Sequence, residues 1–112
     1  MNRRSQTTHR FILLLLFQAE REQATELVIG VASPNLDVPI RCKVGSAWSE
    51  MPAFPARIRP DVVAELVRMA KFQAGQIPGE GVLDESLGDV RLRWRVAITS
   101  ADGECLLVRV QD

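Results

Sequence analysis

The sequence contains few of the residue types on which several classes of function depend. Tyr is absent, His occurs once and Cys occurs twice. Two cysteines match neither a zinc-site spacing nor a dense disulfide framework. The 14 Lys and Arg residues balance the 14 Asp and Glu residues, so the net charge is zero. No long-range field therefore draws the chain to nucleic acid or to an anionic membrane, and a charged partner must be bound by a local patch.

Long apolar runs are also missing, apart from FILLLLF at residues 11–17. Seven residues are far fewer than the roughly 20 that span a bilayer, and no small-residue cleavage pattern follows them. The run therefore predicts a buried helix, from about Thr8 to Ala24, and not a membrane span or a secretory signal. We expect residues 1–10 to form a flexible basic tail and residues 11–112 to form a single domain in the cytoplasm, where Cys42 and Cys105 stay as free thiols.

The clearest pattern lies between Val90 and Val110. Hydrophobic residues alternate with arginines from Val90 to Ile98, which predicts a strand with one buried face. A second β-rich run, from Cys105, follows Asp102-Gly103, where glycine can supply the positive φ of a tight turn. This segment is predicted to be a β-hairpin.

The rest of the chain predicts two helices and further strands. Short apolar or alternating runs indicate strands at 26–32, 38–44, 47–51 and 82–86, separated by turns at 33–35, 45–46 and 87–89. The proline-rich segment 52–60 is expected to be an irregular connector, because proline fixes φ and lacks a donor. Helical spacing then predicts a second helix over about 60–74, ended by Lys71 and Gly75. The result is an α+β fold with five or six mostly antiparallel strands and two helices packed on one face.

Catalytic and phosphate-binding motifs are missing from the sequence. The glycine-rich segment 76–81 is expected to be a loop, and it lacks the spacing of a P-loop. His9 falls in the expected tail with no nucleophile assignable beside it, and the acidic residues of 80–89 are explained by turn solvation more simply than by a metal. We therefore expect no enzyme activity, no metal and no cofactor.

The order of motifs resembles a known family, the motor ATPases of type II secretion and type IV pili. In their PAS-like N-terminal subdomain, a helix ending in Met-Ala leads to a Pro-Gly loop, an arginine-containing strand, a Gly-Glu turn and an apolar strand. The matching segments here are PIRCKV (39–44), EMP (50–52), ELVRMA (65–70), IPGEG (77–81), VRLRWRV (90–96), GE (103–104) and LLVRV (106–110). The resemblance covers residues 11–111 and implies a PAS-like sheet without the P-loop core. It leaves open whether the chain is a stand-alone module or a piece of a longer motor.

Two departures from the family pattern affect the expected function. The strand turn is Gly45-Ser46 where the family has Asp-Gly, and Gly79-Glu80-Gly81 lacks the flanking arginines of the family's loop. In the family, arginines of this subdomain reach toward the nucleotide held by the core, and such positions are lost here. Without that core, the lysine, magnesium ligands and base of phosphoryl transfer are missing.

Two function hypotheses follow. The first is a non-catalytic interaction or regulatory module that contacts a protein partner, such as a secretion or pilus motor component or a second copy of itself. Its expected interface is the apolar helix surface of Phe11, Leu14, Leu15 and Phe17. The second is a module that binds a small anionic ligand or nucleotide on a basic sheet face, where the alternative is a solvated face of paired charges. The residues expected on that basic face are Arg41, Lys43, Arg91, Arg93 and Arg95.

Overall fold

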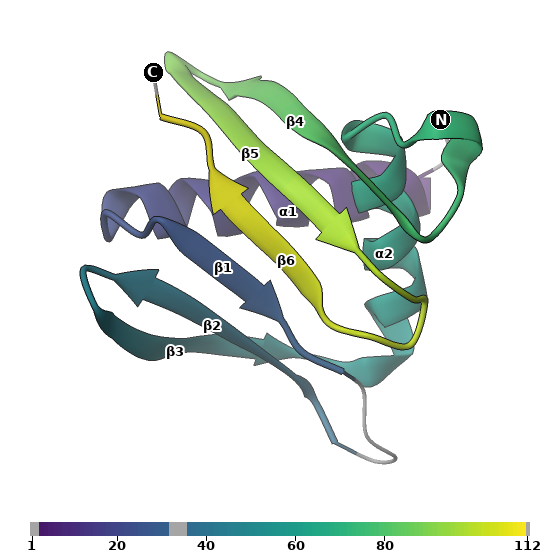
Figure 1. Ribbon diagram of the computed structural model, residues 1–112, viewed down its shortest axis with the longest axis horizontal. Coiled ribbons are helices and arrows are strands. Elements are labelled where there is room, and N and C mark those ends of the chain that lie inside the picture. Colours follow the sequence, from purple (N-terminus) through teal and green to yellow (C-terminus); the bar gives the residue numbers. More distant parts are fainter. Residues whose placement is uncertain (1–2, 32–35, 112) are drawn as a thin grey trace.

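The described residues form one six-stranded sheet and two α-helices (Figure 1). The structure is a computed structural model that describes residues 3–31 and 36–111. The helices are α1 (Arg3–Arg21) and α2 (Arg59–Met69), with short 3-10 helices η1 (Ala56–Ile58) and η2 (Gln73–Gly75). The strands are β1 (Glu26–Ile29), β2 (Val38–Val44), β3 (Ala47–Phe54), β4 (Gly79–Leu87), β5 (Val90–Ile98) and β6 (Cys105–Arg109).

The strands are ordered β3-β2-β1-β6-β5-β4, and every neighbouring pair is antiparallel. The first and last strands of the chain, β1 and β6, thus lie side by side in the centre of the sheet (Figure 1). Two-residue turns close the β2-β3 and β4-β5 hairpins, with Gly45 and Gly88 at φ of 64° and 60°. A positive φ of this kind is easily adopted only by glycine, so these two turns follow directly from the sequence.

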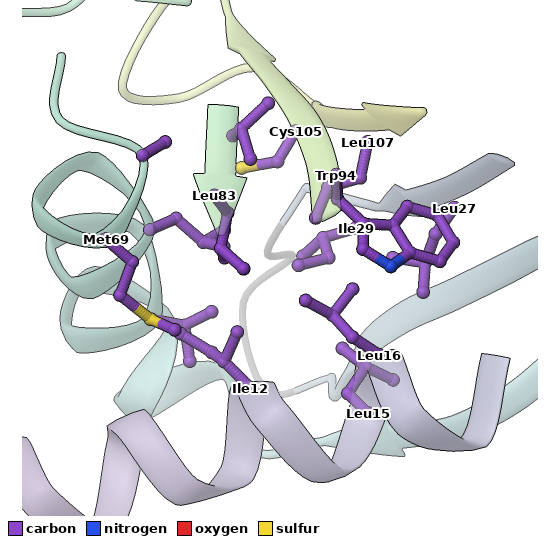
Figure 2. Packing of buried hydrophobic residues seen from close by; sticks show 14 of the residues in the cluster. Ile12, Leu15, Leu16, Leu27, Ile29, Met69, Leu83, Trp94, Cys105 and Leu107 are labelled. Carbon is purple, nitrogen blue, oxygen red and sulfur yellow. The ribbon is translucent and has the colours of Figure 1, made fainter. Parts of the chain in front are cut away.

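Both helices lie against the same face of the sheet (Figure 1). The core lies between these two layers, and Figure 2 shows Leu16 of α1 pointing toward the sheet, where Ile29 and Trp94 lie, and Ile12 of α1 pointing toward the side of Met69 on α2. Trp94 has no exposed surface, and its indole Nε1 donates a 3.0 Å hydrogen bond to Glu20 Oε2 on α1. The predicted α+β fold, with an antiparallel sheet and two helices on one face, is confirmed.

A buried arginine joins three segments that are distant in the sequence. Arg59, at the start of α2, is only 5% exposed. Its Nε donates to Gly30 O at 2.9 Å and its Nη1 to Ala101 O at 3.0 Å, and its Nη2 donates to Gly103 O. Hydrogen bonds to a buried guanidinium are strong because the donor is charged. Arg59 therefore fixes the end of β1 and the β5-β6 connection to the helix layer.

Two predicted boundaries in the N-terminal half are corrected. The first helix begins at Arg3, so residues 3–10, predicted as a flexible tail, form its opening turns. The first strand ends at Ile29, and the predicted turn at 33–35 lies outside the described residues. Just after the end of α1, Gln23 has a positive φ of 64°, and Ala24 N donates a hydrogen bond to Ala19 O in the last turn of the helix. Both alanines are fully buried, so packing fixes this end of the helix.

The prediction of an irregular connector at 52–60 is also wrong. Strand β3 continues through Pro52 to Phe54, and the residues after Pro55 belong to η1 and to the start of α2. Proline is tolerated there because β3 is an edge strand and its register with β2 shifts beside Pro52. The second helix ends at Met69, five residues early, with Lys71 at a φ of 57°. The left-handed conformation of Lys71 lets Phe72 N donate to Val67 O, which caps the end of the helix.

Two glycine predictions differ from the structure as well. Residues 79–81, expected in a loop, begin β4, and a Cβ on Gly81 would lie 2.1 Å from Ala70 O at the end of α2. Glycine is thus needed for the close approach of strand and helix.

The hairpin of β5 and β6 is confirmed, but six residues connect its strands, and Gly103 does not have a positive φ. The connection contains a β-turn in which Gly103 N donates to Ser100 O at 3.1 Å, and Arg59 binds the carbonyl groups of Ala101 and Gly103.

Candidate functional site

The face of the sheet that the helices leave uncovered is the candidate functional site, and we call it the open face. Because side chains alternate along a strand, every strand contributes half of its residues to this face. The register places Arg41, Val28, Leu106 and Ala97 in one row across four strands. A second row holds Lys43, Glu26, Val108 and Arg95.

Large apolar side chains are exposed in the middle of the open face. Leu106 and Val108 of β6 are each 45% exposed, and Trp48 on the edge strand β3 is 44% exposed. Val28 of β1 lies beside Leu106 in register and is buried, yet it is not part of the hydrophobic core cluster on the covered face. An exposed group of apolar side chains on a sheet face is a feature of protein-binding surfaces.

One acidic side chain, Asp84, pairs with two of the three arginines of β5. Arg91 donates to both carboxylate oxygens of Asp84 on β4, at 2.9 and 2.7 Å, and Arg93 Nε lies 3.5 Å from Asp84 Oδ2. The hydrogen bond from Arg91 holds the pKa of Asp84 below its ordinary value, with the charges of Arg91 and Arg93 acting in the same direction. Two of the three arginines in this row thus have a partner on the neighbouring strand.

The basic residues of β2 are paired in the same way. Arg41 lies 3.6 Å from a carboxylate oxygen of Glu104 and stacks over the Trp48 ring, 5.4 Å from its centroid. Lys43 Nζ lies 3.3 Å from Glu26 Oε2 on β1. Exposed ion pairs of this kind contribute little to stability, but they remove the basic character of the surface.

The five predicted basic residues therefore all lie on the open face, but in two groups. Strands β1 and β6 separate Arg41 and Lys43 from the arginines of β5, a gap of roughly 14 Å filled by the apolar centre. Within the described part of the chain, Arg95 makes no ion pair, and neither does Glu50 on the opposite side of the apolar centre. The sequence showed the basic positions, but not that the sheet divides them.

The predicted interface on the first helix is mostly covered. Leu15 is 8% exposed and belongs to the core, and Phe11 packs edge-on against Phe54 with ring centroids 5.4 Å apart. Phe17 is half-buried. Leu14 is the exposed member of this group, at 50%. The helix surface thus presents one large apolar side chain, where the open face presents three.

Sequence reasoning missed a polar cluster that joins three elements on the covered side. The two ring nitrogens of His9 on α1 lie 3.0 Å from Glu65 Oε2 on α2 and 3.2 Å from Glu85 Oε1 on β4. Arg68 also bonds Glu65, through its Nε at 3.1 Å and its Nη2. Burial alone would raise the pKa of Glu65, but the hydrogen bonds from Arg68 and His9 outweigh it and hold the pKa below its ordinary value. His9, expected in a loose tail, is instead a structural link.

The described residues offer little for chemistry. No three His, Cys, Asp or Glu side chains among them are arranged to hold a metal ion. Cys42 and Cys105 are both buried, and burial raises the pKa of the Cys105 thiol, which makes it a poor nucleophile at neutral pH. No described helix has the length and hydropathy that crossing a bilayer requires.

Comparison with known proteins does not add a family. No protein-family model matches the chain, and no curated protein matches it.

Proposed function

We propose that the chain is a non-catalytic interaction module that binds a second copy of itself through the open face. The observation that carries this proposal is the apolar centre of Leu106 and Val108, with Trp48 exposed on the edge strand of the same face, where most of the charged residues already have partners within the chain. A surface whose charges are satisfied internally loses little when water is removed, and its apolar centre gains from burial.

The size of the open face supports a protein partner over a small ligand. Viewed down its shortest axis, with the sheet facing the reader, the molecule measures 32 by 28 Å (Figure 1). An outline of this size is of the order of the roughly 800 Å² that each partner buries in a standard interface. Two such faces would pack as a sandwich with the sheets about 10 Å apart.

The two unpaired charges favour a second copy as the partner. Arg95 on β5 and Glu50 on β3 lie on opposite sides of the apolar centre. A two-fold axis that lies in the interface along β1, midway between β5 and β3, places β5 of each copy over β3 of the other and so brings Arg95 near the Glu50 of the other copy. The same operation lays β1 over β1 and sets Leu106 and Val108 of β6 over the aliphatic stems of Arg41 and Lys43 on β2, in the self-complementary manner of a C2 interface.

The family relationship belongs to this proposal as well. The motif order from residue 39 to residue 110 supports descent from the PAS-like subdomain of the secretion and pilus motors, and the antiparallel sheet with helices on one face is compatible with it. Anionic ligand binding by the basic residues is the weaker alternative, because four of the five already have carboxylate partners.

Sedimentation velocity over a range of concentrations tests the proposal. The wild-type chain should move from 12.5 kDa toward twice that mass as its concentration rises. Leu106→Glu should keep it monomeric, because a carboxylate would be buried in the apolar centre. Leu14→Glu is the matched control, since Leu14 has similar exposure but lies on α1, and it should leave the dimer intact.

Charge reversal tests the geometry of the pairing. Glu50→Arg and Arg95→Glu should each weaken the dimer, and the double variant should restore it, because the reversed charges meet across the interface. A wild-type chain that stays monomeric at all concentrations would refute the proposal. Loss of the dimer in Leu14→Glu but not in Leu106→Glu would move the interface to the helix.

A further inference from the structure

A cleft lies away from the open face, between the N-terminal half of α1 and the beginning of α2. It has a volume of about 760 Å³, which is within the range of roughly 300 to 1,000 Å³ typical of small-molecule sites. The residues that line it come from one side of α1 and from the η1-α2 junction. They are Arg3, Thr7, Thr8, Phe11, Arg57, Ile58, Asp61 and Val62.

The cleft combines apolar side chains with an excess of positive charge. Phe11, Ile58 and Val62 are buried or half-buried and provide an apolar lining. Arg3 and Arg57 are exposed, and within the described part of the chain neither forms an ion pair. The lining also contains Asp61. The two arginines without ion pairs make the cleft suited to an anionic ligand.

We propose that this cleft binds a small monocarboxylate with an apolar tail. The tail lies along the half-buried Phe11 and Ile58, where water is displaced from apolar surface. Arg57 binds the carboxylate, because a guanidinium matches the two oxygens of a carboxylate with two parallel N–H donors. Arg3, across the cleft on α1, adds a second positive charge. Such a site would give the module a small-molecule ligand that is independent of its proposed self-association.

Calorimetry with octanoate at low salt tests this proposal. Octanoate should bind the wild-type chain saturably at one site. Octylamine and 1-octanol, which have the same tail, should bind at least about tenfold more weakly, because they lack the charge that the arginines recognise.

Variants then locate the site. Arg57→Ala should weaken octanoate binding about tenfold or more, while its urea midpoint stays unchanged because Arg57 is exposed and unpaired. Thr7→Trp, on the exposed surface of α1, should block the cleft and also abolish binding. Arg21→Ala is the control, because Arg21 is an exposed arginine at the far end of the same helix. It should bind octanoate like the wild type.

The proposal is overturned if octanoate fails to saturate, or if octanol binds as tightly as octanoate. It is also overturned if Arg57→Ala and Thr7→Trp both bind as the wild type does. Leu106→Glu should retain octanoate binding, because Leu106 is on the open face and outside this cleft. A loss of binding in that variant alone would place the ligand on the open face instead.

Discussion

The two faces of the sheet are built from the same strands, and they differ in what covers them. On the covered face, Leu27, Leu92, Trp94 and Leu107 have at most 1% of their surface exposed. On the open face, Leu106 and Val108 keep 45% exposed, and charged residues form pairs across strands instead of packing. Neighbours in the chain therefore have opposite environments, as at Leu106 and Leu107.

This difference shows that hydrophobicity alone does not report the role of a residue here. Leu106 and Leu107 are the same amino acid on the same strand, yet one is in the core and the other is available to a partner. Arginine shows a similar contrast, since Arg59 is a buried structural residue and Arg95 is an exposed one. Position relative to the helix layer decides between the two roles.

The tryptophans should give the largest contrast between the faces. Trp94→Ala should lower the free energy of unfolding by about 3 to 5 kcal/mol, because it empties a fully buried site and removes the hydrogen bond to Glu20. Trp48→Ala on the open face should cost less than about 1 kcal/mol. Urea denaturation followed by circular dichroism measures both changes, and equal losses would contradict the two-face description.

The adjacent leucines provide a sharper version of the same comparison. Leu107→Ala should cost about 2 to 5 kcal/mol, because it leaves a cavity in the core. Leu106→Ala should leave the stability of the monomer nearly unchanged and should instead weaken self-association. Urea denaturation at a low concentration, where the chain is monomeric, separates the two effects. A large loss from Leu106→Ala under those conditions would show that the open face is part of the monomer's core.

The polar cluster on the covered side should have an intermediate effect that depends on pH. Because the pKa of Glu65 is lowered in the folded state, its contribution is present above its ordinary value of 4.5 and is lost as the pH falls through the lower folded value. Glu65→Gln should therefore cost about 1 to 3 kcal/mol at pH 7 and much less at pH 3. Urea titrations at both pH values measure this.

Glu80→Gln is the matched control for that experiment, because Glu80 is an exposed glutamate at the start of β4. It should change stability little at either pH. An effect of Glu65→Gln that is as large at pH 3 as at pH 7 would contradict an ionised carboxylate held by His9 and Arg68.

The smallest effect on stability should come from Asp84→Asn. Its ion pairs with Arg91 and Arg93 are exposed, so the urea midpoint should barely move. Removing this carboxylate should, however, make the open face more positive by one charge and increase the binding of inorganic phosphate. Calorimetry at low salt measures that increase, and Asp102→Asn, on the exposed β5-β6 connection, serves as the control. Strong phosphate binding by the wild type would favour the anion-binding alternative.

Much of the fold was predictable because local patterns dictate it. Alternation defined β2 and β5, and glycine at residues 45 and 88 defined the hairpin turns. The sequence-based predictions are wrong where tertiary contacts override local conformational preference. Pro52 is inside a strand because that strand is at the edge, and Gly81 begins a strand because a helix end lies against it. His9 was expected in a tail, since its partners Glu65 and Glu85 are more than 50 residues away.

The sequence by itself determined which residues share a face of each strand and which turns join them, because these depend on neighbouring residues and backbone sterics. It also determined that the net charge is zero. Only the tertiary structure decided which face the helices cover, that β1 and β6 separate two basic groups, and which arginines find carboxylates. Those outcomes depend on the order of strands in space, which brings together residues that local patterns cannot connect.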